Sequence, residues 1–263
     1  MDLGLKGQRV LVTGASRGIG LAIAEAFSEE GCALHLVSRT ETDLAVASAR
    51  MGRADAPAPV ILACDAGREG SAAAIGERFP DIDILINNAG GIRHGELLDV
   101  GEAEWRAAWE LKVFGYINLT REYYRRMRER GAGVIVNVIG LAAERLDAGY
   151  IVGSSGNAAL VAFTRALGST SIDSGVRILG VNPGWVETDK SRDTLQRKAV
   201  AEFGDAGRWR ELISRTLGGA RMLQPREIAD VVVFAASERG SGLSGHVITV
   251  DAGVGARQGS NGT

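Results

Sequence analysis

The chain has 263 residues, of which 45% are hydrophobic and 24% are charged, a globular balance that excludes disorder as its main state. The formal net charge of −2 supplies no positive field, so the composition favours neither nucleic acid nor an anionic membrane as a partner. Two isolated cysteines, no apolar run of membrane-spanning length and a charged beginning without signal-peptide character predict a reduced, cytoplasmic protein.

Short apolar segments alternate along the chain with longer amphipathic segments. The short segments are rich in Val, Ile and Leu on both faces, which is typical of strands buried in a parallel sheet. Their alternation with helical patterns predicts right-handed βαβ units. The sequence therefore predicts an α/β fold, with one doubly wound, seven-stranded, mostly parallel sheet and helices on both faces, as a single domain over residues 1–263. In chain order, the expected strands are Arg9–Thr13, Ala33–Ser38, Pro59–Cys64, Asp83–Ile86, Gly133–Ile139, Val176–Val181 and His246–Val250, and the expected helices are Gly18–Glu30, Thr42–Arg53, Glu69–Phe79, Glu102–Arg130, Ser155–Ser171 and Arg226–Ser237.

Residues 183–219 interrupt this alternation. They contain no strand pattern but two polar helical stretches, Ser191–Phe203 and Ala206–Leu217. An insertion after a strand of an α/β sheet usually lies over the carboxyl ends of the strands, where such sheets bind ligands. The sequence leaves two interpretations of residues 183–219: a lid over a binding site, or a solvated surface insertion. Residues 257–263 are expected to form a flexible tail.

A glycine-rich turn follows the first expected strand and leads directly into the first expected helix. Gly14 can turn sharply, Gly18 lets backbone amides approach a phosphate, and Gly20 lets the helix pack closely on the strand. The helix N-terminus offers unpaired N–H groups and a positive dipole end to a pyrophosphate. This strand–turn–helix context predicts a dinucleotide site rather than a purely structural turn. The same turn contains Ser16, Arg17 and Ile19.

The end of the second expected strand indicates which dinucleotide binds. An NAD site would place Asp or Glu there to accept hydrogen bonds from the ribose hydroxyls. This chain has Ser38 and Arg39 there, with Arg17 in the glycine turn. A guanidinium can bind a 2′-phosphate with two hydrogen bonds, which favours NADP(H). NAD(H), with both arginines solvated, is the alternative.

These motifs resemble the short-chain dehydrogenase/reductase family along nearly the whole chain. The resemblance rests on Thr13–Gly20, Asp65 after the third strand, Asn87-Asn88-Ala89-Gly90 after the fourth, Asn182-Pro183-Gly184 with Thr188, and Val250-Asp251-Ala252-Gly253. It implies a Rossmann-type fold, a small-molecule substrate and a homo-oligomer, commonly a tetramer or else a dimer. The cofactor contacts that it implies beyond the glycine turn are Asp65, Ala66, Asn88, Ala89, Gly90, Pro183, Gly184, Val186 and Thr188.

The family's catalytic residues are replaced in this chain. The resemblance implies a tyrosine as general acid or base, a lysine that lowers its pKa and holds the ribose, a serine that polarises the substrate oxygen, and an asparagine that supports a relay water. The aligned places hold Gly153 for the tyrosine, Asn157 for the lysine, Gly140 for the serine and Lys112 for the asparagine. The two glycines leave space but supply no proton.

Lys112 and Asn157 look as though two residue types have changed places. Lys112 would then serve the ribose or the relay water, and Asn157 would supply the amide. The alternative is that Lys112 is simply a cation in a cleft. If the two residue types have changed places, we expect Lys112 and Asn157 both to contact the cofactor.

Other residues could take over the missing proton chemistry. Tyr150 lies three residues before Gly153, about one helical turn if that helix begins early. Alternatively, the Tyr150 ring only forms part of the pocket wall and moves no proton. Ser154 could donate to the substrate or cap the helix, and His94 could titrate or be solvated. No cluster has metal-ligand spacing, so no metal is expected.

These observations predict an NADP(H)-dependent oxidoreductase that moves hydride between the nicotinamide and a carbonyl or alcohol carbon through a rearranged site containing Lys112, Asn157, Tyr150 and Ser154. Trp185 with Arg93, Arg145 and Arg192 around the expected mouth suits an anionic substrate with an apolar part. A non-catalytic NADP(H)-binding sensor or partner subunit is the first alternative. Non-redox chemistry in the same pocket is the second.

Overall fold

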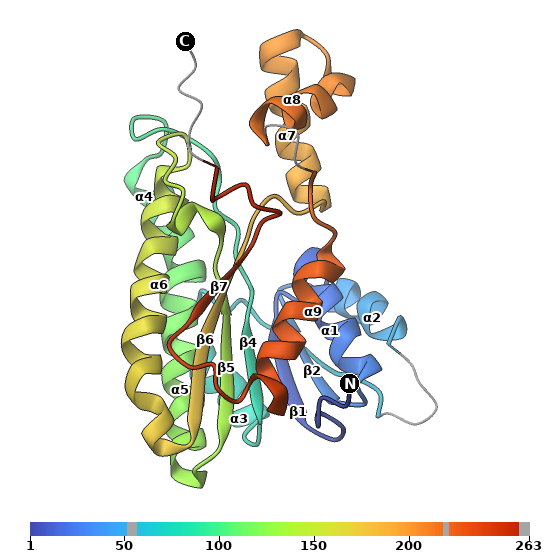
Figure 1. The fold of residues 1–263 in the computed structure, drawn as a ribbon, viewed down its shortest axis with the longest axis vertical. Coiled ribbons are helices and arrows are strands. Elements are labelled where there is room, and N and C mark those ends of the chain that lie inside the picture. The colour runs from blue at the N-terminus through green and yellow to red at the C-terminus, as the bar shows by residue number, and fades with distance from the viewer. Residues whose placement is uncertain (52–56, 218–220, 258–263) are drawn as a thin grey trace.

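The strands of the computed structural model, which describes residues 1–51, 57–217 and 221–257, form one sheet in the order β3-β2-β1-β4-β5-β6-β7 (Figure 1). Every neighbouring pair is parallel. The order reverses between β1 and β4, which makes the doubly wound arrangement and its ligand-binding crevice. The strands are β1 Arg9–Thr13, β2 Ala33–Ser38, β3 Val60–Ala63, β4 Ile84–Asn87, β5 Gly133–Val138, β6 Val176–Pro183 and β7 Val247–Val250.

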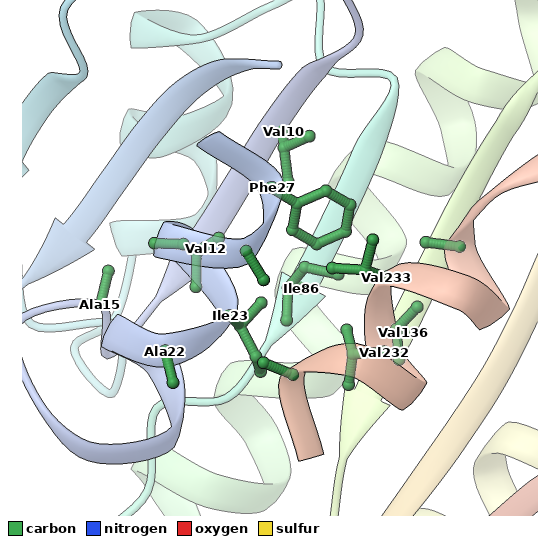
Figure 2. Packing of buried hydrophobic residues seen from close by; sticks show 14 of the residues in the cluster. Val10, Val12, Ala15, Ala22, Ile23, Phe27, Ile86, Val136, Val232 and Val233 are labelled. Carbon is green, nitrogen blue, oxygen red and sulfur yellow. The ribbon is translucent and has the colours of Figure 1, made fainter. Parts of the chain in front are cut away.

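Helices cover both faces of the sheet (Figure 1). On one face, Phe27 and Ile23 of α1 meet Val232 and Val233 of α9 above Val10 and neighbouring strand residues (Figure 2). On the other face, Leu11 and its neighbours pack under α3, α5 and α6. The helices are α1 Gly18–Glu29, α2 Glu41–Ala49, α3 Ser71–Arg78, α4 Glu102–Trp109, α5 Gly115–Arg130, α6 Ile151–Ser171, α7 Asp189–Phe203, α8 Trp209–Thr216 and α9 Pro225–Ala236.

The predicted fold class is confirmed, and the differences in element bounds have physical causes. The helix expected over 102–130 is divided into α4 and α5 by a π-helical segment, Glu110–Phe114. The helix α6 begins at Ile151, four residues earlier than expected, after Tyr150, which has no side-chain capping bond. The strand β6 continues to Pro183 because that residue still pairs with Val250 of β7. The expected end of the second helix, Arg53, lies outside the described residues.

The insertion forms α7 and α8, which stand out beyond the end of the sheet (Figure 1). Thr188 caps α7 reciprocally with Ser191. A hydrophobic cluster joins α7 and α8 to the loops beneath them; its buried members include Leu141, Leu195, Trp209, Leu212, Met222 and Val254. Of the tail expected over 257–263, residues 258–263 lie outside the described part. In the part of the chain that is described, no helix combines the length and apolar character needed to cross a membrane.

Candidate active site

The glycine turn after β1 has the close contacts that its sequence predicts. Gly14 and Gly18 have φ of 65° and 58°, where residues other than glycine are strained. A Cβ on Gly20 would lie 2.2 Å from the Gly14 carbonyl oxygen, so α1 can pack this closely only with glycine there. The side chain of Arg17 is exposed at the N-terminus of α1. The turn thus leaves a cradle of backbone amides open at the crevice, as a pyrophosphate requires.

The loop after β4 is tied to this turn. The Asn88 side-chain amide donates to the Thr13 carbonyl at 3.0 Å, and the Thr13 hydroxyl accepts from the backbone N–H groups of Asn88 and Ala89. These bonds place Ala89 and Gly90 beside Gly14: a Cβ on Gly14 would lie 3.0 Å from the Ala89 Cα. The two motifs therefore form one wall of the crevice.

The end of β2 fits the 2′-phosphate of NADP(H). The Ser38 hydroxyl is buried without a hydrogen-bond partner in the described structure. Arg17 and Arg39 are exposed, and neither forms an ion pair with any described residue. Asp65 accepts from the Gly67 N–H at 3.0 Å, beside the buried Ala66. An orphaned hydroxyl at the end of the strand and two unpaired arginines, one next to it in sequence and one in the glycine turn, are suited to an anionic group.

The segment after β6 also reaches the glycine turn. Pro183 ends β6, and Gly184 approaches Asp251 so closely that a Cβ would lie 2.8 Å from the Asp251 Cβ. Val186 is buried and bridges to Leu223. The Thr188 Cγ2 would lie 3.3 Å from a Cβ on Gly18, so the start of α7 rests on the turn.

Tyr150 fills the space that a side chain at residue 153 would occupy. A Cβ on Gly153 would lie 2.0 Å from Tyr150 Cε1 and 2.1 Å from Cζ. The ring is half-buried, with its centroid 4.4 Å from that of His94, and the hydroxyl has no hydrogen-bond partner among the described residues. Burial raises the pKa of Tyr150 to about 12. The ring of a protonated phenol thus lies where the side chain of a residue larger than glycine at position 153 would begin.

Asn157 reaches in the same way toward Gly140. Gly140 has φ of 146°, and a Cβ there would lie 2.9 Å from Asn157 Nδ2. Asn157 is 3% exposed, and its Oδ1 has no partner in the described structure. The neighbouring Asn182 accepts from the Gly140 N–H at 3.2 Å, but its own Nδ2 has no partner there either. Two buried carboxamides with orphaned atoms at the end of β5 indicate a site for a polar ligand.

The Lys112 ammonium is engaged by protein acceptors. From the π-helical segment, its Nζ donates to the carbonyls of Val138 and Ile139 at 2.9 and 3.0 Å and to the Tyr116 hydroxyl at 3.2 Å. These three bonds use all three donors of an ammonium. A Cβ on Gly90 would lie 2.8 Å from Lys112 Cδ, so the lysine stem passes beneath the cofactor wall. The geometry gives Lys112 the task of fixing the end of β5.

The buried ammonium should make stability depend on pH. Burial, with a smaller contribution from Lys190, lowers the pKa of Lys112 from 10.5 to about 7. Between these two values the unfolded chain binds the extra proton, so the free energy of unfolding rises with pH. Between pH 7 and pH 9, we expect it to rise by about 2 kcal/mol more in the wild type than in Lys112→Met. Chemical denaturation at several pH values measures this, with Lys6→Met as the exposed control; parallel wild-type and Lys112→Met profiles would contradict it.

Ser154 and His94 have surroundings that differ from those that the sequence suggested. The Ser154 hydroxyl donates to the Asp147 carbonyl and accepts from the Asp147 N–H, both at 3.1 Å. It therefore holds the preceding loop, and the expectation that it caps the helix is wrong, because the N-cap is Tyr150. His94 is not solvated: burial, followed by Lys198 and other charges, lowers its pKa to about 4. It is thus a neutral imidazole against the Tyr150 ring. Among the described residues, no group of His, Cys, Asp and Glu is placed to hold a metal.

Lys190 was not singled out from the sequence. It is the second residue of α7, and burial and the Arg17 guanidinium lower its pKa. Its positive charge also lowers the pKa values of His94 and Lys112. The one available signal was the scarcity of lysine in a chain that is rich in arginine.

Comparison with known proteins places this geometry in a family. The family model described as Enoyl-(Acyl carrier protein) reductase matches residues 14–255. Galactitol 2-dehydrogenase (L-tagatose-forming) of Cereibacter sphaeroides is 32% identical over 251 residues, covering 95% of this chain and 95% of that protein. The 3-oxoacyl-(acyl-carrier-protein) reductase FabG of Vibrio cholerae is 31% identical over 254 residues, covering 96% and 99%.

The same architecture occurs in a solved enzyme complex. The structure of L-sorbose reductase from Gluconobacter frateurii, complexed with NADPH and L-sorbose, has a TM-score of 0.88 and 28% sequence identity. The match covers 98% of this chain and 100% of that one. The match of the family model over most of the chain, together with relatives above 30% identity along nearly its full length, shows that this chain belongs to the short-chain dehydrogenase/reductase family.

Proposed function

We propose that the protein is an NADP(H)-dependent carbonyl reductase in which Tyr150 is the proton donor and Asn157 orients the carbonyl. The observation that carries this proposal is the Tyr150 ring, which lies where a side chain on Gly153 would begin. Asn157 stands in the same relation to Gly140. At Gly140 the group in the vacated space is a hydrogen-bond donor, Asn157 Nδ2, and at Gly153 it is the ring that carries the Tyr150 hydroxyl.

The cofactor assignment rests on charge at the end of β2. Arg17 and Arg39 are unpaired among the described residues, and the buried Ser38 hydroxyl lacks a partner. These groups would hold the 2′-phosphate, and the amides of the glycine turn would hold the pyrophosphate. Bound NADPH supplies a hydride, with its two electrons, to the carbonyl carbon. The NADPH complex of L-sorbose reductase, with its TM-score of 0.88, supports this assignment.

The side chains then have separate tasks. The Asn157 amide donates to the carbonyl oxygen and stabilises the negative charge that develops there. The Tyr150 phenol transfers its proton to that oxygen, so the C=O group becomes an alcohol, and the phenolate regains a proton from water. Lys112 is a positioning residue, since its bonds to Val138 and Ile139 fix the chain that leads to Gly140.

The ionisation of Tyr150 favours reduction over alcohol oxidation. Its pKa of about 12 keeps the phenol protonated throughout the physiological range. A proton donor is therefore present at neutral pH, whereas the phenolate needed to accept a proton from an alcohol is scarce. The neutral His94 beside it supplies no charge that would lower this pKa.

Gly153→Ala should disable the enzyme through Tyr150. The added Cβ would lie 2.0 Å from the ring, so the ring must leave its place. We expect kcat to fall by about tenfold or more, whereas the Kd for NADPH stays within about twofold, because misplacing a proton donor affects the chemical step. Steady-state kinetics and NADPH titration measure both quantities.

The control for Gly153→Ala is the same substitution in a Tyr150→Phe background. If the glycine acts by seating the ring, Gly153→Ala costs little further activity there. Additive losses in the double variant would show that Gly153 acts by another route.

The proposal is tested by combining the protein with NADPH and a panel of ketones and aldehydes. We expect tighter binding of NADPH than of NADH and consumption of NADPH with at least one class of carbonyl. Tight binding without turnover on any substrate would instead indicate a non-catalytic NADP(H)-binding protein. Product formation without change in nicotinamide absorbance would indicate non-redox chemistry.

A further inference from the structure

Three of the four lysines of this chain lie around the candidate active site. The lysines are Lys6, Lys112, Lys190 and Lys198, against 26 arginines. Both Lys190 and Lys198, on α7, lower the pKa of His94, as does Arg197. Only Asp147 opposes them among the charges that act on that imidazole, and one of its carboxylate oxygens already accepts from the Gly149 N–H. The insertion therefore directs positive charge toward the Tyr150–His94 pair.

A cavity of about 420 Å³, open to solvent, lies between α7 and α8 and is lined in part by Trp185. Leu195 and Leu212 form its buried apolar floor. The one carboxylate on its wall, Glu202, is paired with Arg215. Lys198, also on the wall, forms no ion pair with any described residue. The cavity thus combines apolar walls with a single uncompensated cation.

Aromatic rings connect this cavity to the candidate proton donor. The Trp185 ring, which lines the cavity, lies nearly parallel to the His94 ring at a centroid distance of 6.3 Å. His94 in turn lies 4.4 Å from Tyr150. A molecule that reached from Tyr150 to Lys198 would therefore have to pass along these rings.

The arginines that the sequence suggested for an anion are otherwise engaged. Arg93 pairs with Glu104 at 2.6 Å, and Arg192 lies 3.8 Å from each of Glu187 and Asp189. Arg145 donates to the Val254 carbonyl. Because their charges are compensated or directed elsewhere, Lys198 is the better-placed cation for a substrate anion.

We propose that the substrate is a carbonyl compound with a carboxylate at the end of an apolar chain, and that Lys198 binds this carboxylate while the chain occupies the cavity beside Trp185. For the carbonyl end of the substrate, this inference rests on the proposed function. The carboxylate subsite itself makes a separate prediction about binding. Lys198 would determine specificity without taking part in the chemical step.

The test begins with binding, so that it does not depend on turnover. Octanoate and its neutral analogue octanamide are titrated by calorimetry into the NADPH-bound protein. We expect the wild type to bind octanoate about tenfold more tightly, the size typical of a hydrogen bond to a charged group. Lys198→Gln should remove this preference, and Lys6→Gln, an equal charge change at a distant exposed site, should keep it.

Kinetics then place the subsite on the substrate path. With oxo-carboxylates and their methyl esters, Lys198→Gln should raise KM for the acids about tenfold, leave kcat within about twofold and leave the esters unchanged. An equal preference for octanoate in the wild type and Lys198→Gln overturns the subsite. If that preference depends on Lys198 but no carbonyl is reduced, the subsite stands and the reductase proposal fails.

Discussion

Tyr150→Phe should lower kcat for NADPH-dependent carbonyl reduction by about 10²- to 10⁴-fold, the range that a positioned general acid supplies. The substitution removes only the hydroxyl, so the ring still packs against His94 and still fills the space over Gly153. The Kd for NADPH should therefore stay within about twofold. Single-turnover measurement of NADPH oxidation isolates the chemical step from product release.

The matched control for this prediction is Tyr116→Phe. Tyr116 is a fully buried tyrosine near the site, but its hydroxyl donates to the Val138 carbonyl at 2.9 Å and accepts from Lys112. Its loss should affect stability more than the rate of hydride transfer. If Tyr150→Phe and Tyr116→Phe reduce activity equally, or if Tyr150→Phe retains wild-type activity, Tyr150 is not the proton donor.

Gly20→Ala should abolish the dinucleotide site. The added Cβ would lie 2.2 Å from the Gly14 carbonyl oxygen and 2.4 Å from Asn88 Nδ2, and the backbone atom cannot move without opening the turn. We expect the Kd for NADPH to rise by about 100-fold or more and the free energy of unfolding to fall by about 3 kcal/mol, at the upper end for overpacking a rigid site. NADPH titration and denaturant unfolding measure the two effects.

Gly242→Ala is the control for Gly20→Ala. Gly242 has open space where a Cβ would lie and an ordinary φ. Alanine there should leave the Kd for NADPH within about twofold and the free energy of unfolding within about 0.5 kcal/mol, as for an unconstrained surface site. Wild-type NADPH affinity in Gly20→Ala would show that the cofactor does not lie over this turn.

The fold was predictable because the signals that determine it are local and repeated. The bounds of β1 and β2 match the sequence prediction, since buried parallel strands are short runs of Val, Leu and Ile bordered by polar residues. The π-helical segment was not predictable, because the helical pattern continues through Glu110–Phe114. The early start of α6 was missed because Tyr150 offers no capping side chain.

The candidate site was predictable only where the motif fixes the backbone. The glycine turn determines its own geometry, so the close approach of α1 at Gly20 followed from the sequence pattern. Which neighbour would fill the space at Gly153 depends on the path of the loop before α6, which Ser154 and Asp147 hold. Lys112 shows the same limit: Tyr116 lies one helical turn away, but the other two acceptors, Val138 and Ile139, come from the end of β5, and no spacing along the chain reveals them.

A crystal structure of the protein with NADP⁺ and a bound alcohol product tests the rearranged site most directly. We predict that the product oxygen lies within hydrogen-bond distance of both the Tyr150 hydroxyl and Asn157 Nδ2, with the carbinol carbon facing the nicotinamide. The account would be contradicted if that oxygen were held by other groups while Tyr150 faced away from it.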